Sequence, residues 1–258
     1  MLLAPDDVLP LLRARVSNIA PSVLVVGDPA RVLRAAELLT GAREVGRNRE
    51  YLVLSGSFDG VPVTVASHGV GAAGAAVGFE ELLRAGARVL IRAGTAGGLQ
   101  PAVTDGDLVI ATGAVREEGT SVRLVPAEYP AVAHPAVVGA LTAAAPDAHT
   151  GLMLTSDLFY PMPLLGSSLQ LWADAGVTAV EMELSVLLVL ASLRGVHAGG
   201  IFAIDGSPLA GADMRDYSPH RDVVRTAADA AIRAGLIALA ALGREPELSP
   251  RPAGPPGS

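Results

Sequence analysis

The sequence predicts an α/β protein, with a single domain in which a central mixed β-sheet is flanked by helices. The first observation is that apolar, β-branched runs alternate with helical patterns along most of the 258 residues, an order typical of a sheet covered on both faces. The second is composition, because 50% of the residues are hydrophobic but only 3% are aromatic. A core of this kind, mostly Ala, Val and Leu, favours close-packed helices on a buried parallel sheet over an all-β sandwich.

The expected strands are short apolar runs, rich in β-branched residues and bounded by turn-forming residues. In chain order they are 22–26, 51–57, 61–67, 88–93, 107–115, 150–154 and 196–204. Asp59-Gly60, between the second and third runs, is a pair typical of hairpin turns. These two strands are therefore expected to be antiparallel neighbours.

The expected helices are segments whose apolar and small residues recur at helical spacing. In chain order they are 29–39, 72–85, 134–144, 183–194 and 217–242. Pro29 suits the first turn of its helix. The last residues, 244–258, are rich in Pro and Gly and are expected to be a disordered tail, which leaves 1–243 as one domain.

The bulk composition argues against several classes of protein. A formal net charge of −7 disfavours a general nucleic-acid binder, which needs a basic face. The chain has no cysteine, which excludes disulfides, thiolate metal sites and a thiol nucleophile. The first residues lack a secretory pattern, and the apolar runs are shorter than the ~20 residues that cross a bilayer. We therefore expect a cytoplasmic protein that does not bind membranes.

Two arginines near strand ends are candidate anion ligands, since ligands of open α/β sheets bind at the carboxyl ends of strands. Gly27 and Arg31 flank a helix start, where backbone N–H groups attract phosphate, although an ordinary start capped by Asp28 fits equally well. Arg92 lies in an apolar strand, where a guanidinium needs a partner or a polar cavity. Bidentate phosphate contacts suit it, and a structural salt bridge is the alternative. Thr95 adds a hydroxyl nearby.

Two acidic segments complete the candidate site. Val180-Glu181-Met182-Glu183 precedes a helix, and Asp205 follows a buried strand. Together with the arginines they predict a site for an anion and a polar, sugar-like molecule. Simpler explanations stay open: Glu183 can favour its helix start through the dipole, Met182 can fill the core, and Asp205 can form a turn.

Gly69-Val70-Gly71-Ala72-Ala73-Gly74 matches the dinucleotide-binding pattern G-x-G-x-x-G and lies between an expected strand and helix. That pattern needs an acidic residue about 20 positions later, at the end of the next strand. Here the next strand ends in Arg92-Ala93-Gly94, so NAD binding is disfavoured. Close helix–sheet packing, or close approach of the backbone to a small ligand, explains the glycines. A structural role beside them is favoured for His68 over that of a base.

Several ordered motifs carry a resemblance to a known family. They are 23–29, 48–51, 67–71, 91–94, 156–157, 160–161, 180–184 and 204–206. In these motifs the chain, from about 11 to 242, resembles the nucleoside phosphorylases of the smaller-subunit, usually hexameric class, and within it the malaria-parasite type of purine nucleoside phosphorylase. The resemblance implies phosphorolysis of a nucleoside to a free base and a pentose 1-phosphate, with inorganic phosphate as co-substrate and neither cofactor nor metal.

The resemblance also implies a role for each candidate residue. The residues implied to hold phosphate are Gly27, Arg31, Arg49, Arg92 and Thr95. Those implied to hold ribose are Met182 and Glu183, and those at the base are Phe159, Val180 and Asp205, the last serving purine N7. Arg49 would reach the site of a neighbouring subunit, which implies a homo-oligomer, a hexamer or trimer of dimers. A solvated surface charge is the simpler explanation for Arg49.

The chain departs from the family pattern at its N-terminal segment and after Asp205, and it lacks residues expected of a uridine phosphorylase. Residues 11–15 lack the histidine expected at the ribose 5′-hydroxyl, so 5′-modified nucleosides are expected to be tolerated. The loop after Asp205 lacks an aromatic residue that could cover the base, and its small residues suit a mobile lid. Residues 156–161 also resemble uridine phosphorylase, but the Gln and Arg expected next for a uracil ring are missing from 162–166.

Three alternatives to a purine phosphorylase remain. The first is a uridine phosphorylase. The second is a nucleosidase that uses water, which has little use for Arg31, Arg49 and Arg92 together. The third is a non-catalytic nucleoside- or NAD-binding protein, which would have no need of both Glu183 and Asp205.

Overall fold

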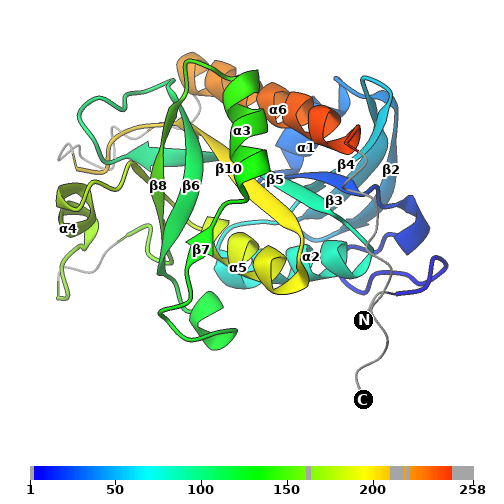
Figure 1. Ribbon diagram of the computed structural model, residues 1–258, viewed down its shortest axis with the longest axis horizontal. Helices are drawn as coiled ribbons and strands as arrows, with labels where there is room; N and C mark the ends of the chain where they lie inside the picture. Colours follow the sequence, from blue (N-terminus) through cyan, green and yellow to red (C-terminus); the bar gives the residue numbers. More distant parts are fainter. Residues whose placement is uncertain (1–2, 161–163, 210–217, 219–220, 246–258) are drawn as a thin grey trace.

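The computed structural model describes residues 3–160, 164–209, 218 and 221–245. Within them the chain forms a single α/β domain, in which helices cover both faces of a mixed sheet of ten strands (Figure 1). The strands are β1 (Ser22–Val26), β2 (Thr40–Asn48), β3 (Tyr51–Phe58), β4 (Val61–Ser67), β5 (Val89–Gly98), β6 (Leu108–Glu117), β7 (Ala131–Val132), β8 (His149–Ser156), β9 (Ala179–Glu181) and β10 (His197–Ile204).

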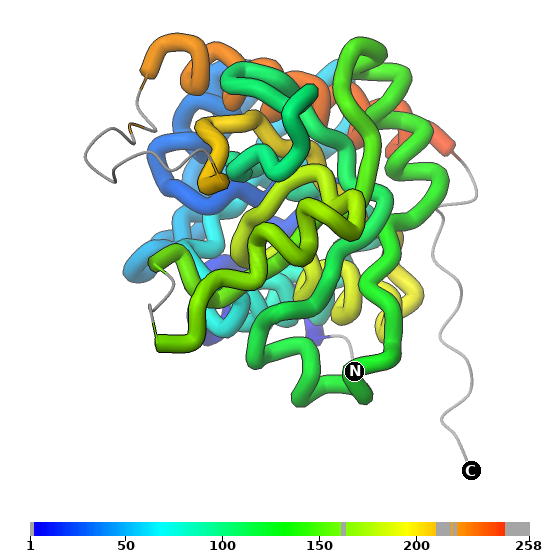
Figure 2. Tube along the Cα trace, turned by 90° about the vertical axis from the view of Figure 1, so that its left-hand side faces the viewer, coloured from blue at the N-terminus to red at the C-terminus, as the bar shows by residue number. Residues whose placement is uncertain are grey.

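The sheet closes on itself at one end. Its order is β10-β6-β8-β9-β5-β1-β4-β3-β2, β7 pairs with β6, and β10 also pairs with β5 along its whole length. Strands β5, β9, β8, β6 and β10 therefore form a ring, from which β1, β4, β3 and β2 extend as an open sheet. Figure 2 views the ring side, with α4, β6 and β8 towards the viewer. Because β1, β4, β5 and β10 are parallel, their carboxyl ends lie at one edge.

Helices pack on this sheet in two groups (Figure 1). The helices are α1 (Pro29–Ala36), α2 (Ala72–Arg84), α3 (Pro135–Ala144), α4 (Leu169–Asp174), α5 (Leu184–Arg194) and α6 (Asp222–Gly243), with 3₁₀ turns η1 (Val16–Asn18) and η2 (Ser121–Arg123). Helices α2 and α5 contact each other on one side, whereas α1 and α3 contact α6 on the other. The first eight residues of α5 are all buried, which explains why this helix is apolar around its circumference.

Helix α6 is long and apolar enough to cross a bilayer, and no other described helix is. In this fold, however, 61% of its apolar window is buried, and it packs on β1, β5 and β10. Its composition is that of a core helix.

The structure corrects several sequence-based boundaries. Strand β2 was not expected, because its side chains are mostly exposed and polar; pairing with β3 at the edge of the sheet is what makes it a strand. Strand β5 continues to Gly98 through residues expected to be a turn, because β10 and β9 pair with that stretch. Strand β9 and helix α4 were also missed, being too short to show periodicity. Helix α6 begins at Asp222; Tyr217 and the tail from 246 lie outside the described residues.

Candidate active site

A large cavity opens at the carboxyl ends of β1, β5 and β10. Its volume is about 1980 Å³, above the ~300–1,000 Å³ of an ordinary ligand pocket, so it has room for two substrates. The predicted site residues that line it are Gly27, Arg31, Arg92, Thr95, Phe159, Val180, Met182, Glu183 and Asp205. The structure thus brings together every predicted site residue except Arg49.

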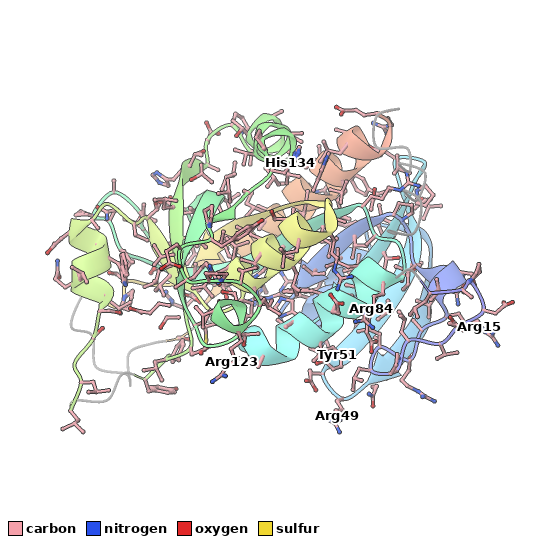
Figure 3. The ribbon with its side chains drawn as sticks, turned by 60° about the horizontal axis from the view of Figure 1, so that its bottom comes forward. Arg15, Arg49, Tyr51, Arg84, Arg123 and His134 are labelled. Carbon is pink, nitrogen blue, oxygen red and sulfur yellow. The ribbon has the colours of Figure 1, made fainter. Side chains whose placement is uncertain are left out.

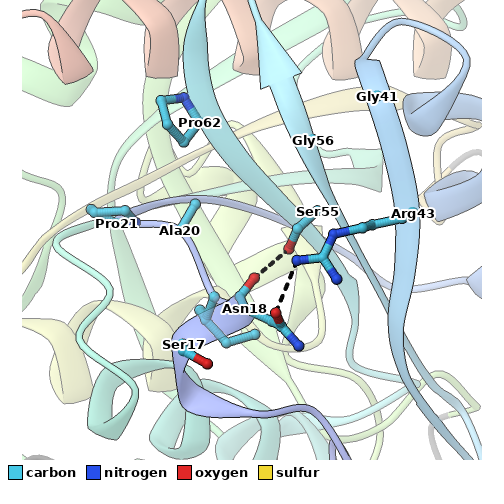
Figure 4. Close-up of a pocket in the computed structure, with 10 residues that line it drawn as sticks. Ser17, Asn18, Ala20, Pro21, Gly41, Arg43, Ser55, Gly56 and Pro62 are labelled. Carbon is cyan, nitrogen blue, oxygen red and sulfur yellow. Dashed lines mark hydrogen bonds between the residues drawn. The ribbon is translucent and has the colours of Figure 1, made fainter. Parts of the chain in front are cut away.

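A second, smaller cavity of about 370 Å³ lies between η1 and the β2–β3 edge (Figure 4). Its polar groups bind one another: Arg43 Nη2 donates to Asn18 Oδ1 at 2.9 Å, and Ser55 Oγ donates to the Asn18 carbonyl at 2.7 Å. No predicted site residue lines it. We therefore assign the candidate active site to the large cavity.

The end of β1 supplies the first cationic wall of the cavity. Asp28 caps α1, since its carboxylate accepts the Ala30 N–H at 2.8 Å, and this places Arg31 in the first turn with its side chain at the cavity. The cap by Asp28 is thus confirmed, and phosphate binding by Gly27 and Arg31 stays a prediction. Burial, and next the charge of Arg92, lower the pKa of the Arg31 guanidinium. Two cations that disfavour each other across a cavity favour an anion between them.

Arg92 is buried in β5, with only 3% of its surface exposed. Its guanidinium carbon lies 5.2 Å from the ring centroid of Phe202, a cation–π contact. Two glycines leave space for this pair: a Cβ at Gly94 would lie 2.9 Å from Arg92 Nη1, and a Cβ at Gly200 would lie 2.8 Å from the Phe202 ring. Gly94 therefore leaves space for the arginine, and Gly200 leaves space for the ring that the arginine contacts.

Three side chains hold the Arg92 guanidinium. Its Nε donates to Glu181 Oε2 at 3.1 Å, its Nη2 donates to Glu183 Oε2, and its Nη1 lies 3.1 Å from His68 Nε2. Arg92 thus makes the structural ion pair that the sequence left open and also lines the cavity. Burial, and next the charge of Arg92, hold the pKa of His68 well below its usual value, so the imidazole is neutral and accepts from Arg92. This geometry fits the structural role favoured for His68.

Glu183 faces the cavity rather than its own helix. It occupies the N-cap position of α5 but makes no side-chain cap bond; its Oε1 accepts the Gly71 N–H at 2.6 Å. Burial raises the pKa of Glu183, and the charge of Arg92 opposes that shift. Gly71 has φ 93°, which only glycine adopts without strain. The glycine pattern therefore presents an N–H to a carboxylate, and Glu183 is more than a helix-start residue.

The α5 cap comes instead from Glu181, to which the sequence assigned no role. Both of its carboxylate oxygens lie 2.9 Å from the Leu184 N–H. An acidic residue just before an expected helix is a signal for a cap, and the sequence offers two, Glu181 and Glu183. Which of them caps the helix depends on where β9 ends, and β9 was not expected.

Asp205 lies at the end of β10 and is 7% exposed. Its N–H donates to the Ala96 carbonyl at 3.0 Å, and its own carbonyl accepts from Arg221 Nη2 at 2.9 Å. Arg221 also pairs with Asp105 and lines the cavity. It lies outside any motif, so the sequence offered no signal for it. The backbone of Asp205 is therefore held on both sides, with its carboxyl at the cavity.

The remaining wall of the cavity is more open. Phe159 is 47% exposed and makes a T-shaped contact with Tyr160, with 4.9 Å between ring centroids. Val180 and Met182 are half-buried. Two sequence-based expectations fall partly outside the described residues. These are the uracil ligands missing from 162–166 and the lid expected after Asp205, because 161–163 and 210–217 are not described.

Two predicted features lie away from the cavity. Arg49 is exposed at the turn between β2 and β3, with φ 52°, and points outward (Figure 3). The N-terminal segment without the family's histidine is fastened elsewhere, because the Leu11 and Leu12 N–H groups donate to Glu81 at 2.8 Å each. Over the described residues, no group of three or more His, Asp or Glu could hold a metal ion.

Comparisons with known proteins agree with this geometry. The model of the phosphorylase superfamily matches residues 21–242. Purine nucleoside phosphorylase of Plasmodium vivax is 41% identical over 73% of this chain and 79% of its own, and uridine phosphorylase of Treponema pallidum is 37% identical over 84% and 90%. The crystal structure of purine nucleoside phosphorylase from Toxoplasma gondii in complex with immucillin-H superposes with a TM-score of 0.88 and 36% identity, covering 95% of this chain and 99% of that one.

These matches confirm the resemblance to the malaria-parasite type, and they include both purine and uridine enzymes. The chain therefore belongs to the phosphorylase superfamily and is a nucleoside phosphorylase, an enzyme that transfers a pentosyl group.

Proposed function

We propose that the protein cleaves purine ribo- or deoxyribonucleosides with inorganic phosphate, releasing the free purine and the pentose 1-phosphate. The observation that carries this proposal is the arrangement of the cavity, which the cations Arg31 and Arg92 line together with two buried carboxylates. These carboxylates belong to Glu183 and Asp205, at the start of α5 and the end of β10. Arg31, Arg92, Thr95 and the Gly27 N–H would hold phosphate, and Met182 and Glu183 would face the sugar. Asp205, with Phe159 and Val180, would face the base.

The proposed chemistry uses these groups in a single displacement. A phosphate oxygen bonds to C1′ of the sugar as the bond from C1′ to the base nitrogen breaks. The sugar gains positive charge in the transition state and the base gains negative charge. Phosphate held by the arginines offsets the first, and Asp205 donates a proton or hydrogen bond to purine N7 to offset the second. General-acid help of this kind contributes about 10²–10⁴-fold to the rate.

Uridine phosphorolysis is the second candidate, favoured by the 37% identity to the Treponema pallidum enzyme. A hydrolytic nucleosidase is the third, and the cationic wall counts against it, because water needs no anion site. As parts of the same proposal, the enzyme is cytoplasmic, uses no cofactor, and is a homo-oligomer of the hexameric type. In such an assembly Arg49, which points away from its own cavity, would reach the phosphate of a neighbouring copy.

The test is turnover of inosine and of uridine by the purified protein, each with and without phosphate. We expect release of hypoxanthine that depends on phosphate, and release of uracil that is at least about tenfold slower. Uracil would leave the buried carboxyl of Asp205 without its partner, and discrimination of this kind reaches ~10⁴-fold. Faster uracil release would transfer the assignment to the second candidate. Release of base without phosphate would identify a hydrolase.

A further inference from the structure

Glu181 is a buried carboxylate, 4% exposed, at the end of β9. Its Oε2 accepts from Arg92 Nε at 3.1 Å and from the Glu183 N–H at 2.8 Å. Its Oε1 accepts from Thr155 Oγ1 at 2.6 Å and from the Leu184 N–H at 2.9 Å. One side chain thus binds the guanidinium, the backbone of Glu183 and the first turn of α5.

These bonds restrict the guanidinium in a specific way. Nε and Nη2 of Arg92 each lie 3.1 Å from the same oxygen, Glu181 Oε2. A carboxylate oxygen against this edge prevents the planar guanidinium from turning about its long axis. Glu181 thereby also fixes the direction in which the opposite edge of the Arg92 guanidinium, at Nη1, points in the cavity.

The same carboxylate determines where Glu183 lies. By accepting the N–H groups of Glu183 and Leu184, it sets the position at which α5 begins. Glu183 reaches the cavity from that start and meets Arg92 Nη2 and the Gly71 N–H. The separation of Arg92 from Glu183 therefore depends on Glu181.

We propose that Glu181 is a positioning residue for phosphorolysis, holding the phosphate ligand Arg92 and the ribose ligand Glu183 in register with each other. The proposal rests on the proposed function of these two ligands. Its effect on the use of phosphate is exerted through Arg92, so that effect disappears when the guanidinium edge is removed.

Glu118, which directly follows β6 and binds α5 through Ser185, is a matched control. It is also 4% exposed, and it accepts from the Thr120 N–H at 2.6 Å, the Ser121 N–H at 2.8 Å and Ser185 Oγ at 2.9 Å. Like Glu181, it is a buried carboxylate that binds two backbone N–H groups and one hydroxyl and contacts α5. Unlike Glu181, it has no bond to Arg92, so Glu118→Gln tests the loss of a buried charge alone.

The experiment is a double-mutant cycle in the full-length protein. Glu181→Gln and Glu118→Gln are each made in the wild type and in an Arg92→Lys background, and kcat and KM are measured with phosphate varied at saturating inosine. We expect Glu181→Gln to lower kcat/KM for phosphate by about 10- to 100-fold in the wild type, since a misplacement of ~1 Å costs about 10²-fold. In the Arg92→Lys background the further loss should be below about twofold. Glu118→Gln should cost the same factor in both backgrounds.

A second variant and a binding readout keep the test decisive. Thr155→Val removes the hydroxyl that orients Glu181 and should reproduce the phosphate effect at smaller size. The rise in Tm caused by phosphate is measured for every variant, because it reports anion binding without turnover. If Glu181→Gln costs the same factor in both backgrounds, or acts like Glu118→Gln, the positioning role is refuted. A wild type without phosphate-dependent turnover would refute the proposed function instead, and the Tm cycle would still decide whether Glu181 acts through Arg92.

Discussion

At the scale of single residues, the cavity is organised by a buried arginine between two buried glutamates. Taking such charges out of water is costly, and a buried ion pair is by itself weak support for stability. Arg92 is nevertheless paired with Glu181 and Glu183, stacked on Phe202 and surrounded by glycines that leave it space. These contacts are explained if the guanidinium must keep one orientation at the cavity.

Replacement of Asp205 and replacement of Arg92 are expected to change different kinetic constants. Asp205→Asn keeps the shape of the side chain but removes the proton donor, so kcat for inosine should fall by about 10²–10⁴-fold with little change in the KM for phosphate. Arg92→Ala should chiefly raise the KM for phosphate, because it removes a cation from the anion site. Steady-state kinetics with each substrate varied in turn separates the two. Equal and small effects of both changes would contradict the assigned roles.

At the scale of elements, packing decides which local preferences matter. Helix α3 has an exposed Gly139 with open space around its Cβ position, whereas Gly235 of α6 faces Leu24, whose Cδ1 would lie 2.6 Å from an added Cβ. Gly139 lowers the helix propensity of α3, and packing does not require a glycine there. Gly235 is required by the close approach of α6 to β1.

The two glycines therefore predict opposite effects of the same substitution. Gly139→Ala should raise the free energy of unfolding by about 0.5–1 kcal/mol, because alanine loses less chain entropy in a helix. Gly235→Ala should lower it by about 1–3 kcal/mol, because the added methyl overpacks the core. Urea unfolding at one protein concentration measures both. A gain in stability for Gly235→Ala would show that α6 can move away from the sheet at no cost.

At the scale of the whole molecule, closure of the ring places the ligands of the cavity on several strands. Pairing of β10 with β5 puts Ala203 beside Thr95, and pairing of β5 with β9 puts Gly97 beside Val180. The site thus exists only when the sheet is complete, and stability and activity should be lost together. Acid is one condition that tests the whole fold.

Stability is expected to fall as the pH drops below 6.5. Burial lowers the pKa of His68, His134 and His197 from 6.5, helped at His68 by Arg92 and at His134 by His197, on which it stacks at 3.5 Å between ring centroids. Below pH 6.5 the unfolded histidines therefore bind protons that the folded ones exclude, so the stability present above 6.5 is lost as pH falls towards the folded pKa values. Chemical denaturation at about pH 7.5 and about pH 5.5 measures the loss.

His197→Phe provides the control for this pH dependence. Phenylalanine keeps a flat ring against His134 but cannot bind a proton, so the loss of stability between the two pH values should be smaller than in the wild type. An equal loss in both proteins would mean that the stacked pair does not contribute.

The amino-acid pattern alone determined the alternation of strands and helices, the Asp59-Gly60 hairpin and the placement of Gly27 and Asp205 at strand ends. These features are local, because side-chain periodicity and turn chemistry are encoded within a few residues of each position. Family motifs then predicted nine residues that the structure gathers around one cavity.

Other features were decided only by the tertiary structure. Strands β2 and β9 carry too little periodicity to be recognised, and they form because partner strands supply their hydrogen bonds. The bond between Arg92 and Glu181 joins residues 89 positions apart, and the same carboxylate accepts the Leu184 N–H at the start of α5. No local pattern encodes such a contact, since its energy depends on burial and on pairings that exist only once the ring of strands has closed.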